Sequence, residues 1–237
     1  MLSTVLHKSF ESAANQLLGF FFPSFCTACK TKLAATEKCV CQSCISKIQI
    51  ADSERIEREY HRKFSHNNII SAFQSAFVFE KDKELQDILH ALKYNNKFLV
   101  GKFLGELIAS QVGEQVKTWN ADMIIPVPLH SLKKAERGYN QAELICKGIS
   151  KVLFIPTKPN VLKRSRYTLS QTTMTLEERK ENVHKAFVLR KKRKITGKRI
   201  IIVDDVLTTG ATITECARVL KENGAEEVYA LSVAIAD

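Results

Sequence analysis

The sequence predicts an α/β protein in which helices flank a parallel sheet and a small cysteine-rich module precedes the sheet. From residue 69 onward, short apolar segments alternate with amphipathic segments of helical period, the pattern of parallel strands joined by crossover helices. Five of the seven cysteines fall within residues 26–44. A chain of 237 residues can hold one domain of ordinary size and a small module.

The chain divides into three predicted parts. Residues 1–50 hold an N-terminal helix and the cysteine module, residues 51–68 are a linker, and residues 69–237 form the sheet domain. Apolar residues near helical spacing predict an amphipathic helix over residues 1–22, which Pro23 ends. Residues 51–68 are polar and charged, which is typical of a linker or of an exposed helix.

The first half of the sheet domain begins with residues 69–79, which predict one long strand or a pair of strands. A helix is expected next, because apolar residues follow the i, i+3, i+4, i+7 pattern at Leu85, Ile88, Leu89 and Leu92. Residues 99–112 predict a second helix, with one apolar face formed by Leu104, Leu107 and Ile108.

The second half contains two further strand and helix pairs. A buried strand over Met123–Val127 is followed by a predicted basic loop over Ser131–Gly138. Asn140 can cap the next helix, with Glu143 closing a capping box. The remaining elements are expected to be a strand at Arg199–Asp204, a helix over about Thr212–Glu222, a turn at Gly224 and a strand at Val228–Ala234.

The charge of the chain favours an anionic partner. The formal net charge is +11, and such an excess attracts nucleic acids, diphosphates or anionic membrane surfaces. The alternative is a basic face without a polyanionic partner. The apolar run Leu17–Phe22 is too short to span a bilayer, and the features of a signal peptide do not frame it. We therefore expect a cytoplasmic protein with no membrane span.

The cysteine cluster reads CTACKTKLAATEKCVCQSC over residues 26–44. Two CxxC pairs separated by eleven residues supply four thiolates to one tetrahedral ion, which predicts a structural zinc ribbon with the ligands Cys26, Cys29, Cys41 and Cys44. Cys39 is an alternative to Cys41 as third ligand. A set of buried or redox-active cysteines is the alternative to zinc. Cys146 and Cys216 lie in predicted helices and are expected to be small core residues.

The segment IIIVDDVLTTGAT at residues 200–212 carries the clearest functional signal. A buried strand ends in the carboxylates Asp204 and Asp205, and a threonine-rich turn leads into a helix. This turn lies at the carboxyl edge of the sheet, where ligands bind in open α/β folds. Its backbone N–H groups and the hydroxyls of Thr208, Thr209 and Thr212 can surround a monophosphate.

The two carboxylates need a different partner, because they repel phosphate. They suit the adjacent hydroxyls of a ribose, or a Mg²⁺ ion held by those hydroxyls. A ribose 5-phosphate would therefore span the carboxylates and the loop. The chain contains neither GxxxxGK[ST] nor GxGxxG after the first strand, which disfavours a P-loop and a dinucleotide site. The alternative is an ordinary strand, turn and helix with surface acids.

This segment resembles the phosphoribosyl pyrophosphate (PRPP) signature of type I phosphoribosyltransferases, and the whole chain resembles the ComF competence family. Besides the cysteine ribbon, the matching segments are LKYNNK at 92–97, PVPLH at 126–130, RGYNQAEL at 137–144, LKRSRYTLSQ at 162–171 and RKENVHKAF at 179–187. They occur in the family's order and cover nearly the whole chain.

The resemblance implies a type I phosphoribosyltransferase-like fold and a role for each motif. PRPP, bound with magnesium, would contact Asp204 and Asp205 through its ribose and Thr208, Thr209, Gly210, Ala211 and Thr212 through its 5-phosphate. The loop after Pro128, with Arg137 and Gly138, would lie near the pyrophosphate. Residues 164–171 would form a mobile hood with Arg179 behind it, and cationic donors there would stabilise a departing pyrophosphate.

Two further implications concern the acceptor and the partners. Thr208 stands where 6-oxopurine enzymes usually carry an acid, so a 6-oxopurine acceptor is not expected. The family acts in DNA uptake during natural transformation, beside a helicase-like translocase, which implies contact with single-stranded DNA. The basic run RKKRK at 190–194 is either a solvated loop or, with Lys163, Arg164, Arg166 and Tyr167, part of a groove for single strands.

Two functions remain open from the sequence. The first is a ComF-type PRPP-binding protein that handles incoming single-stranded DNA. The second is a metabolic phosphoribosyltransferase that transfers ribose 5-phosphate to an unidentified acceptor and releases pyrophosphate. Catalysis would depend on Asp204, Asp205, Arg137 and Arg179.

Overall fold

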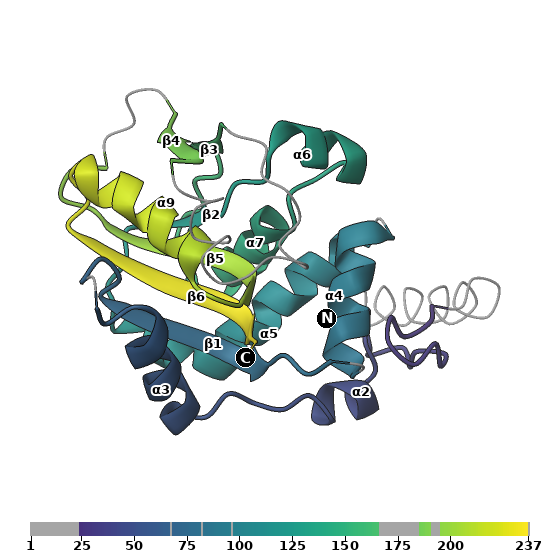
Figure 1. Cartoon of the computed structure of the whole chain (residues 1–237). Coiled ribbons are helices and arrows are strands. Elements are labelled where there is room, and N and C mark those ends of the chain that lie inside the picture. The colour runs from purple at the N-terminus through teal and green to yellow at the C-terminus, as the bar shows by residue number, and fades with distance from the viewer. Residues whose placement is uncertain are drawn as a thin grey trace, which may run out of the picture.

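A computed structural model describes residues 24–66, 68–81, 83–95, 97–165, 185–190 and 195–236. The predicted helix over residues 1–22, Arg179, most of the hood and most of the RKKRK run lie outside the described residues. A four-stranded parallel sheet in the order β1-β6-β5-β2 forms the centre (Figure 1). Its strands are β1 (Ala72–Val78), β2 (Met123–Pro126), β5 (Arg199–Leu207) and β6 (Glu227–Ile235). The predicted parallel α/β class is confirmed.

Strand β5 is buried because it lies between β6 and β2, with helices on both faces of the sheet. Ile200, Ile201, Ile202 and Val203 are all fully buried. A strand that packs on both faces needs consecutive apolar residues rather than alternating ones. The strand runs on past Val203 to Leu207. Asp204 and Asp205, called the acidic pair below, therefore lie within the strand rather than just beyond it.

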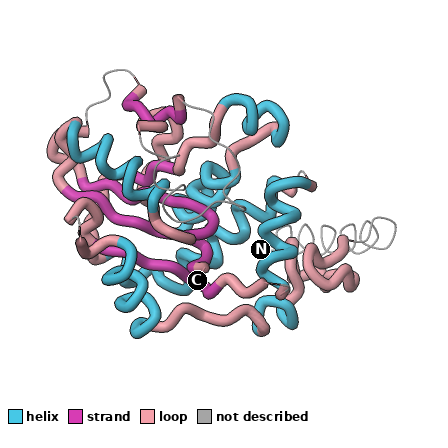
Figure 2. Tube along the Cα trace, in the orientation of Figure 1, coloured by secondary structure: helices cyan, strands magenta, loops and turns pink. Residues whose placement is uncertain are grey.

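Helices lie on both faces of the sheet (Figure 1), and a hydrophobic layer on each face holds them to it. Helices α4 (Glu84–Tyr94), α5 (Phe98–Lys117) and α7 (Gln141–Leu153) pack on one face, together with side chains of the cysteine module. Helices α3 (Ser53–Lys63) and α9 (Ala211–Glu222) pack on the other. The helices predicted at 85–92, 99–112, 140 onward and 212–222 are therefore present, and Figure 2 shows how they alternate with the strands.

The predicted basic loop at Ser131–Gly138 is wrong, because residues Ser131–Arg137 form helix α6. The His130 imidazole accepts a hydrogen bond from the backbone N–H of Leu132 at the N-terminus. Gly138 ends the helix in a left-handed conformation with φ of 80°. None of the α6 residues is buried, so the helix lacks the apolar period by which sequence patterns reveal helices.

Helix α7 begins as predicted, with the Asn140 side chain accepting the N–H of Ala142 at 3.1 Å. The carboxylate of Glu143 pairs with Lys147 at 3.0 Å instead of closing the expected capping box. Strands β3 (Leu162–Arg164) and β4 (Phe187–Leu189) form a small antiparallel sheet that the sequence did not predict. They flank the predicted hood and lie at the edge of the fold above β2 (Figure 1).

The N-terminal module joins the sheet domain through backbone contacts along β1. After the short helix α2 (Gln42–Ser46), the N–H of Val78 donates to Gln49 O and that of Ala51 to Ala76 O. Residues Ser53–Lys63 then form α3, which agrees with the helix that was one of the two alternatives for this segment, and Ile56 lies on its buried side. Phe64, directly after the helix, is also buried. The boundaries at residues 50 and 68 stay predictions. No helix in the described part of the chain is long and apolar enough to cross a bilayer.

Candidate ligand pocket and metal centre

A pocket of about 350 Å³ lies at the carboxyl edge of the sheet, where β2 and β5 end. Its walls come from α4, α6, α7, β3, β5, the loop after β2 and the start of α9. The residues with chemically active groups are Lys93, Tyr94, Lys133, Arg137, Gln141, Arg164, Asp204, Asp205, Thr208, Thr209 and Thr212. Chain segments from residue 93 to residue 213 therefore meet in one place.

The loop at residues 208–210 presents backbone donors to the pocket. Helix α9 follows it directly, and the first N–H groups of a helix have no carbonyl partner within the helix. The N–H of Ala211 donates to Thr209 Oγ1 at 3.3 Å. The next two residues, Thr212 and Ile213, line the pocket at the positive end of the helix dipole. This geometry suits an anion with several acceptor oxygens.

Gly210 is required at the turn into α9 for two reasons. Its φ is 78°, in the left-handed region where a side chain is strained. A Cβ atom there would also lie 2.9 Å from Cε1 of Phe64, which follows helix α3. Phe64 is completely buried, so it supports the loop from behind and cannot move away easily.

The two aspartates differ in their surroundings. Asp205 is buried, and its Oδ2 atom lies 2.6 Å from Nζ of Lys93 on α4. Asp204 is partly exposed on the pocket wall, and its Oδ1 atom accepts the N–H of Asp205 at 2.9 Å. Asp205 is thus held in an ion pair, whereas Asp204 has a backbone partner and faces the space that a ligand would enter.

These surroundings shift the pKa values of the pair in opposite directions. Burial raises the pKa of Asp204 well above its usual value, and the charge of Asp205 adds to this effect. Burial also acts to raise the pKa of Asp205, but the ammonium group of Lys93 outweighs it and the pKa of Asp205 falls. Burial lowers the pKa of Lys93, yet the charges of Asp205 and Asp204 raise it overall. At neutral pH, Lys93 and Asp205 are therefore a charged pair.

Three further cations line the other side of the pocket. Arg137 donates to Gln141 Oε1 at 2.5 Å and lies 5.5 Å from the ring centroid of Tyr94. The guanidinium of Arg164 lies 5.3 Å from the ring centroid of Phe187. Burial and the charges of Arg164 and Arg137 lower the pKa of Lys133. An anion in the pocket would relieve this mutual repulsion.

The structure brings together most of the residues selected from the sequence. Asp204, Asp205, the loop residues 208–212 and Arg137 all line one pocket, as does Arg164 at the start of the hood. Arg179 lies outside the described residues. Lys93, Lys133 and Tyr94 had no predicted role. Lys93 had a detectable signal, because it follows Leu85 and Leu89 by eight and four positions and so shares their apolar helix face.

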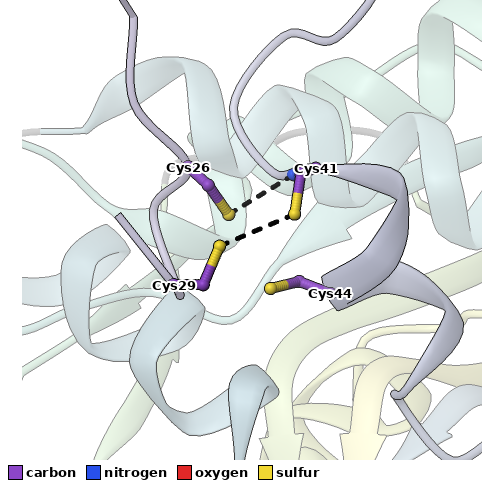
Figure 3. A group of neighbouring side chains, drawn as sticks. All are labelled: Cys26, Cys29, Cys41 and Cys44. Atoms are coloured by element: carbon purple, nitrogen blue, oxygen red, sulfur yellow. Dashed lines mark hydrogen bonds between the residues drawn. The ribbon is translucent and has the colours of Figure 1, made fainter. Parts of the chain in front are cut away.

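The second site is the cysteine cluster, in which Cys26, Cys29, Cys41 and Cys44 point toward one another (Figure 3). Their sulfur atoms all lie within 4.8 Å of one another, and those of Cys29 and Cys41 are 3.7 Å apart. Zinc–sulfur bonds of about 2.3 Å in a tetrahedron place sulfurs about 3.8 Å apart. The four donors therefore fit one tetrahedral ion, and Cys41 rather than Cys39 is the third member.

The four cysteines have different surroundings, and the pKa values of Cys41 and Cys44 are raised, that of Cys44 mainly by burial. Cys26, Cys41 and Cys44 are buried, and the N–H of Cys41 points at the Cys26 sulfur at 3.3 Å. Hydrogen bonds with the side chain and backbone of Thr31 lower the pKa of Cys29 to about 6. Burial instead raises the pKa of Cys39. Cys146 and Cys216 are fully buried in α7 and α9, which confirms them as core residues.

The chain is similar to known proteins along most of its length. The phosphoribosyl transferase domain family matches residues 100–236. The chain is 28% identical over 224 residues to Competence protein F of Haemophilus influenzae, which covers 90% of this chain and 98% of that protein. It is 33% identical to DNA utilization protein YhgH of Escherichia coli, over 61% of this chain and 64% of that protein. Competence protein ComFC of Streptococcus pneumoniae is 27% identical over 66% of each chain.

Proposed function

We propose that this chain, which belongs to the phosphoribosyltransferase family and within it to the ComF competence proteins, binds PRPP or a related ribose phosphate and handles single-stranded DNA during DNA uptake. One observation carries the ligand assignment. Asp204 and the N-terminus of α9 open into the same pocket, so a diol and a phosphate can be recognised at once. The relatives named for competence and DNA utilization support the cellular role.

The pocket suggests how PRPP would lie. Its 5-phosphate would accept hydrogen bonds from the loop at residues 208–212 and from the first N–H groups of α9. Its ribose hydroxyls would donate to Asp204 and Asp205. The diphosphate would then extend toward Lys133, Arg137 and Arg164, which line the same cavity. The 5-phosphate and the ribose thus meet hydrogen-bonding partners, and the diphosphate meets cationic side chains.

We further propose that the four-cysteine cluster binds one structural zinc ion. All four positions would be taken by thiolates, which leaves no open site for a substrate. Residues 24–50 contain little regular secondary structure besides α2, so metal binding would provide much of their folding free energy. The same residues carry four lysines against one glutamate, and we propose that this basic module contributes to DNA contact. A translocase partner stays a prediction.

Thermal unfolding tests the ligand assignment. PRPP should raise the melting temperature of the wild type, and the double variant Asp204→Asn, Asp205→Asn should lose that shift. The double variant Glu226→Gln, Glu227→Gln is a matched control, since it removes two adjacent carboxylates at the start of β6, where β6 pairs with the start of β5 rather than with its carboxyl end. An equal PRPP shift in both double variants would refute the ribose assignment.

The DNA assignment needs its own test. Single-stranded oligonucleotides should bind with an affinity that falls steeply as salt rises, because lysine and arginine contacts to phosphates release counterions. Fluorescence anisotropy at several salt concentrations measures the slope. No binding at low salt would favour the second candidate function.

That second candidate is a metabolic phosphoribosyltransferase acting on an unidentified acceptor. The cations on the diphosphate side of the pocket favour it, since they would stabilise a departing pyrophosphate. A search for pyrophosphate release with candidate acceptors, oligonucleotides included, tests turnover. Release that depends on both PRPP and an acceptor would establish catalysis.

A further inference from the structure

The helix turn that carries Lys93 is fixed by packing around its neighbour Leu92. Lys93 lies in the last turn of α4, and the preceding residue, Leu92, is completely buried. The hydroxyl of Tyr139 donates a hydrogen bond to the carbonyl oxygen of Leu92, and the ring of Tyr139 contacts that of Phe98 with centroids 4.6 Å apart. The end of α4 is therefore fixed against the segment that links α6 to α7.

The ammonium group of Lys93 provides a cation from the protein itself at Asp205. Lys93 Nζ lies 2.6 Å from Asp205 Oδ2, an ion-pair contact that lacks the angles of a hydrogen bond and leaves this buried oxygen without a hydrogen-bond donor. Its side chain is 27% exposed and the Asp205 side chain 8%. The pair therefore lies at the base of the pocket, shielded from most solvent, and still open to a ligand on one side.

Magnesium fits poorly at the same carboxylates. Mg²⁺ needs oxygen ligands at about 2.0–2.1 Å in octahedral geometry, but the ammonium group of Lys93 already covers Asp205 Oδ2. Asp204 Oδ1 already accepts a backbone hydrogen bond. Among the residues that the structure describes, the pocket lining also holds four cationic side chains, Lys93, Lys133, Arg137 and Arg164, against two carboxylates. A divalent cation would enter a region that is already positive.

We propose that Lys93 serves as the resident cation of this site, so that a ribose phosphate binds beside Asp204 and Asp205 without a divalent metal at the acidic pair. This inference rests on the proposed function of the pocket. An ammonium group has three donors, and its contact with Asp205 is an ion pair rather than an aligned hydrogen bond. These donors can bind ribose hydroxyl oxygens while the hydroxyl hydrogens bind the carboxylates. Lys93 is thus a positioning residue that sets the metal requirement of the site.

Isothermal titration of the full chain with ribose 5-phosphate tests the proposal, since this ligand lacks the diphosphate that itself binds Mg²⁺. The wild type should bind equally well in EDTA and in excess Mg²⁺. Lys93→Met should weaken binding in EDTA by roughly tenfold or more, the loss expected for one charge-assisted contact. Lys93→Arg keeps the charge and should retain metal-free binding. Lys97→Met removes a neighbouring exposed lysine outside the pocket and should behave as the wild type.

Each other outcome has a distinct meaning. Binding by the wild type only in Mg²⁺ would overturn the role of Lys93 and leave the proposed function standing. No binding in either condition, with PRPP also inert, would refute the proposed function itself. Tighter binding by Lys93→Met than by the wild type would identify Lys93 as a plug that competes with the ligand, and would also overturn the proposal. Circular dichroism of each variant separates these outcomes from loss of folding.

Discussion

The cysteine cluster and the ligand pocket gather charged groups by different means. The cluster takes four identical donors from residues 26–44, and two local turns bring them together. The pocket takes its groups from residues 93 to 213, which only the completed sheet places side by side. Local spacing therefore determines the first site, whereas topology determines the second.

The two sites also differ in where their positive charge comes from. The four cysteine sulfurs lie within 4.8 Å of one another, and in our account an external ion offsets the charge of their thiolates. The acidic pair instead has Lys93, an internal cation, against Asp205. The cysteine module should therefore lose its fold when metal is removed. The ligand pocket should keep its structure when metal is removed.

The largest effect should come from the cysteine cluster. Cys44→Ser removes one of four ligands, and we expect zinc content to fall from about one ion per chain to nearly none, because a three-thiolate site loses most of its binding free energy. Metal analysis of purified protein measures this, and limited proteolysis should show cleavage within residues 24–50. Cys39→Ala is the control, since Cys39 is buried outside the cluster. Loss of zinc in both variants would show that the four ligands are wrongly assigned.

Asp205→Asn should destabilise the fold by about 2 kcal/mol, less than for a fully buried pair because Lys93 keeps some solvent contact. The pKa of Asp205 is lowered by Lys93, so its contribution is present above the unfolded pKa and is lost as pH falls through the folded pKa. Urea unfolding at several pH values measures this. A difference from the wild type that persists unchanged in acid would contradict the ion pair.

Gly210→Ala should lower the free energy of unfolding by more than the ~1–2 kcal/mol of a left-handed backbone, because a Cβ would also meet Phe64 at 2.9 Å. The same contact should shift the loop and weaken ribose phosphate binding. Gly197→Ala is a matched control: Gly197 has φ of 67° but no atom within 4 Å of the added carbon. Gly197→Ala should lose the ~1–2 kcal/mol of backbone strain and keep full affinity. Equal affinities in the two variants would count against a phosphate at this loop.

The smallest expected effect is a gain in stability rather than a loss. Asp204→Asn should stabilise the free protein at pH 7 by about 1 kcal/mol, or roughly 2–4 °C, while abolishing ligand binding. The pKa of Asp204 is raised, so its ionisation costs stability as pH rises from the unfolded pKa toward the folded one. The gain should vanish below about pH 4. A variant less stable than the wild type at pH 7 would contradict this.

Periodicity and spacing predicted the parts of the molecule in which local sequence decides the structure. The two CxxC pairs, the apolar strand at 200–203 and the helix with Leu85 and Leu89 are of this kind. Helix α6 was missed because all its residues are exposed or half-buried, so caps alone define it. The partner of Asp205 was missed because α4 and β5 meet only in three dimensions. Lys93, on the apolar face of α4, was the sequence feature that indicated this contact.

A crystal structure with ribose 5-phosphate tests the central claim most directly. We predict that the phosphate lies within about 3 Å of the N–H groups at the start of α9, and that the ribose hydroxyls contact Asp204 and Asp205 with Lys93 still in place. A phosphate bound elsewhere, with Asp204 and Asp205 free of ligand, would contradict the account.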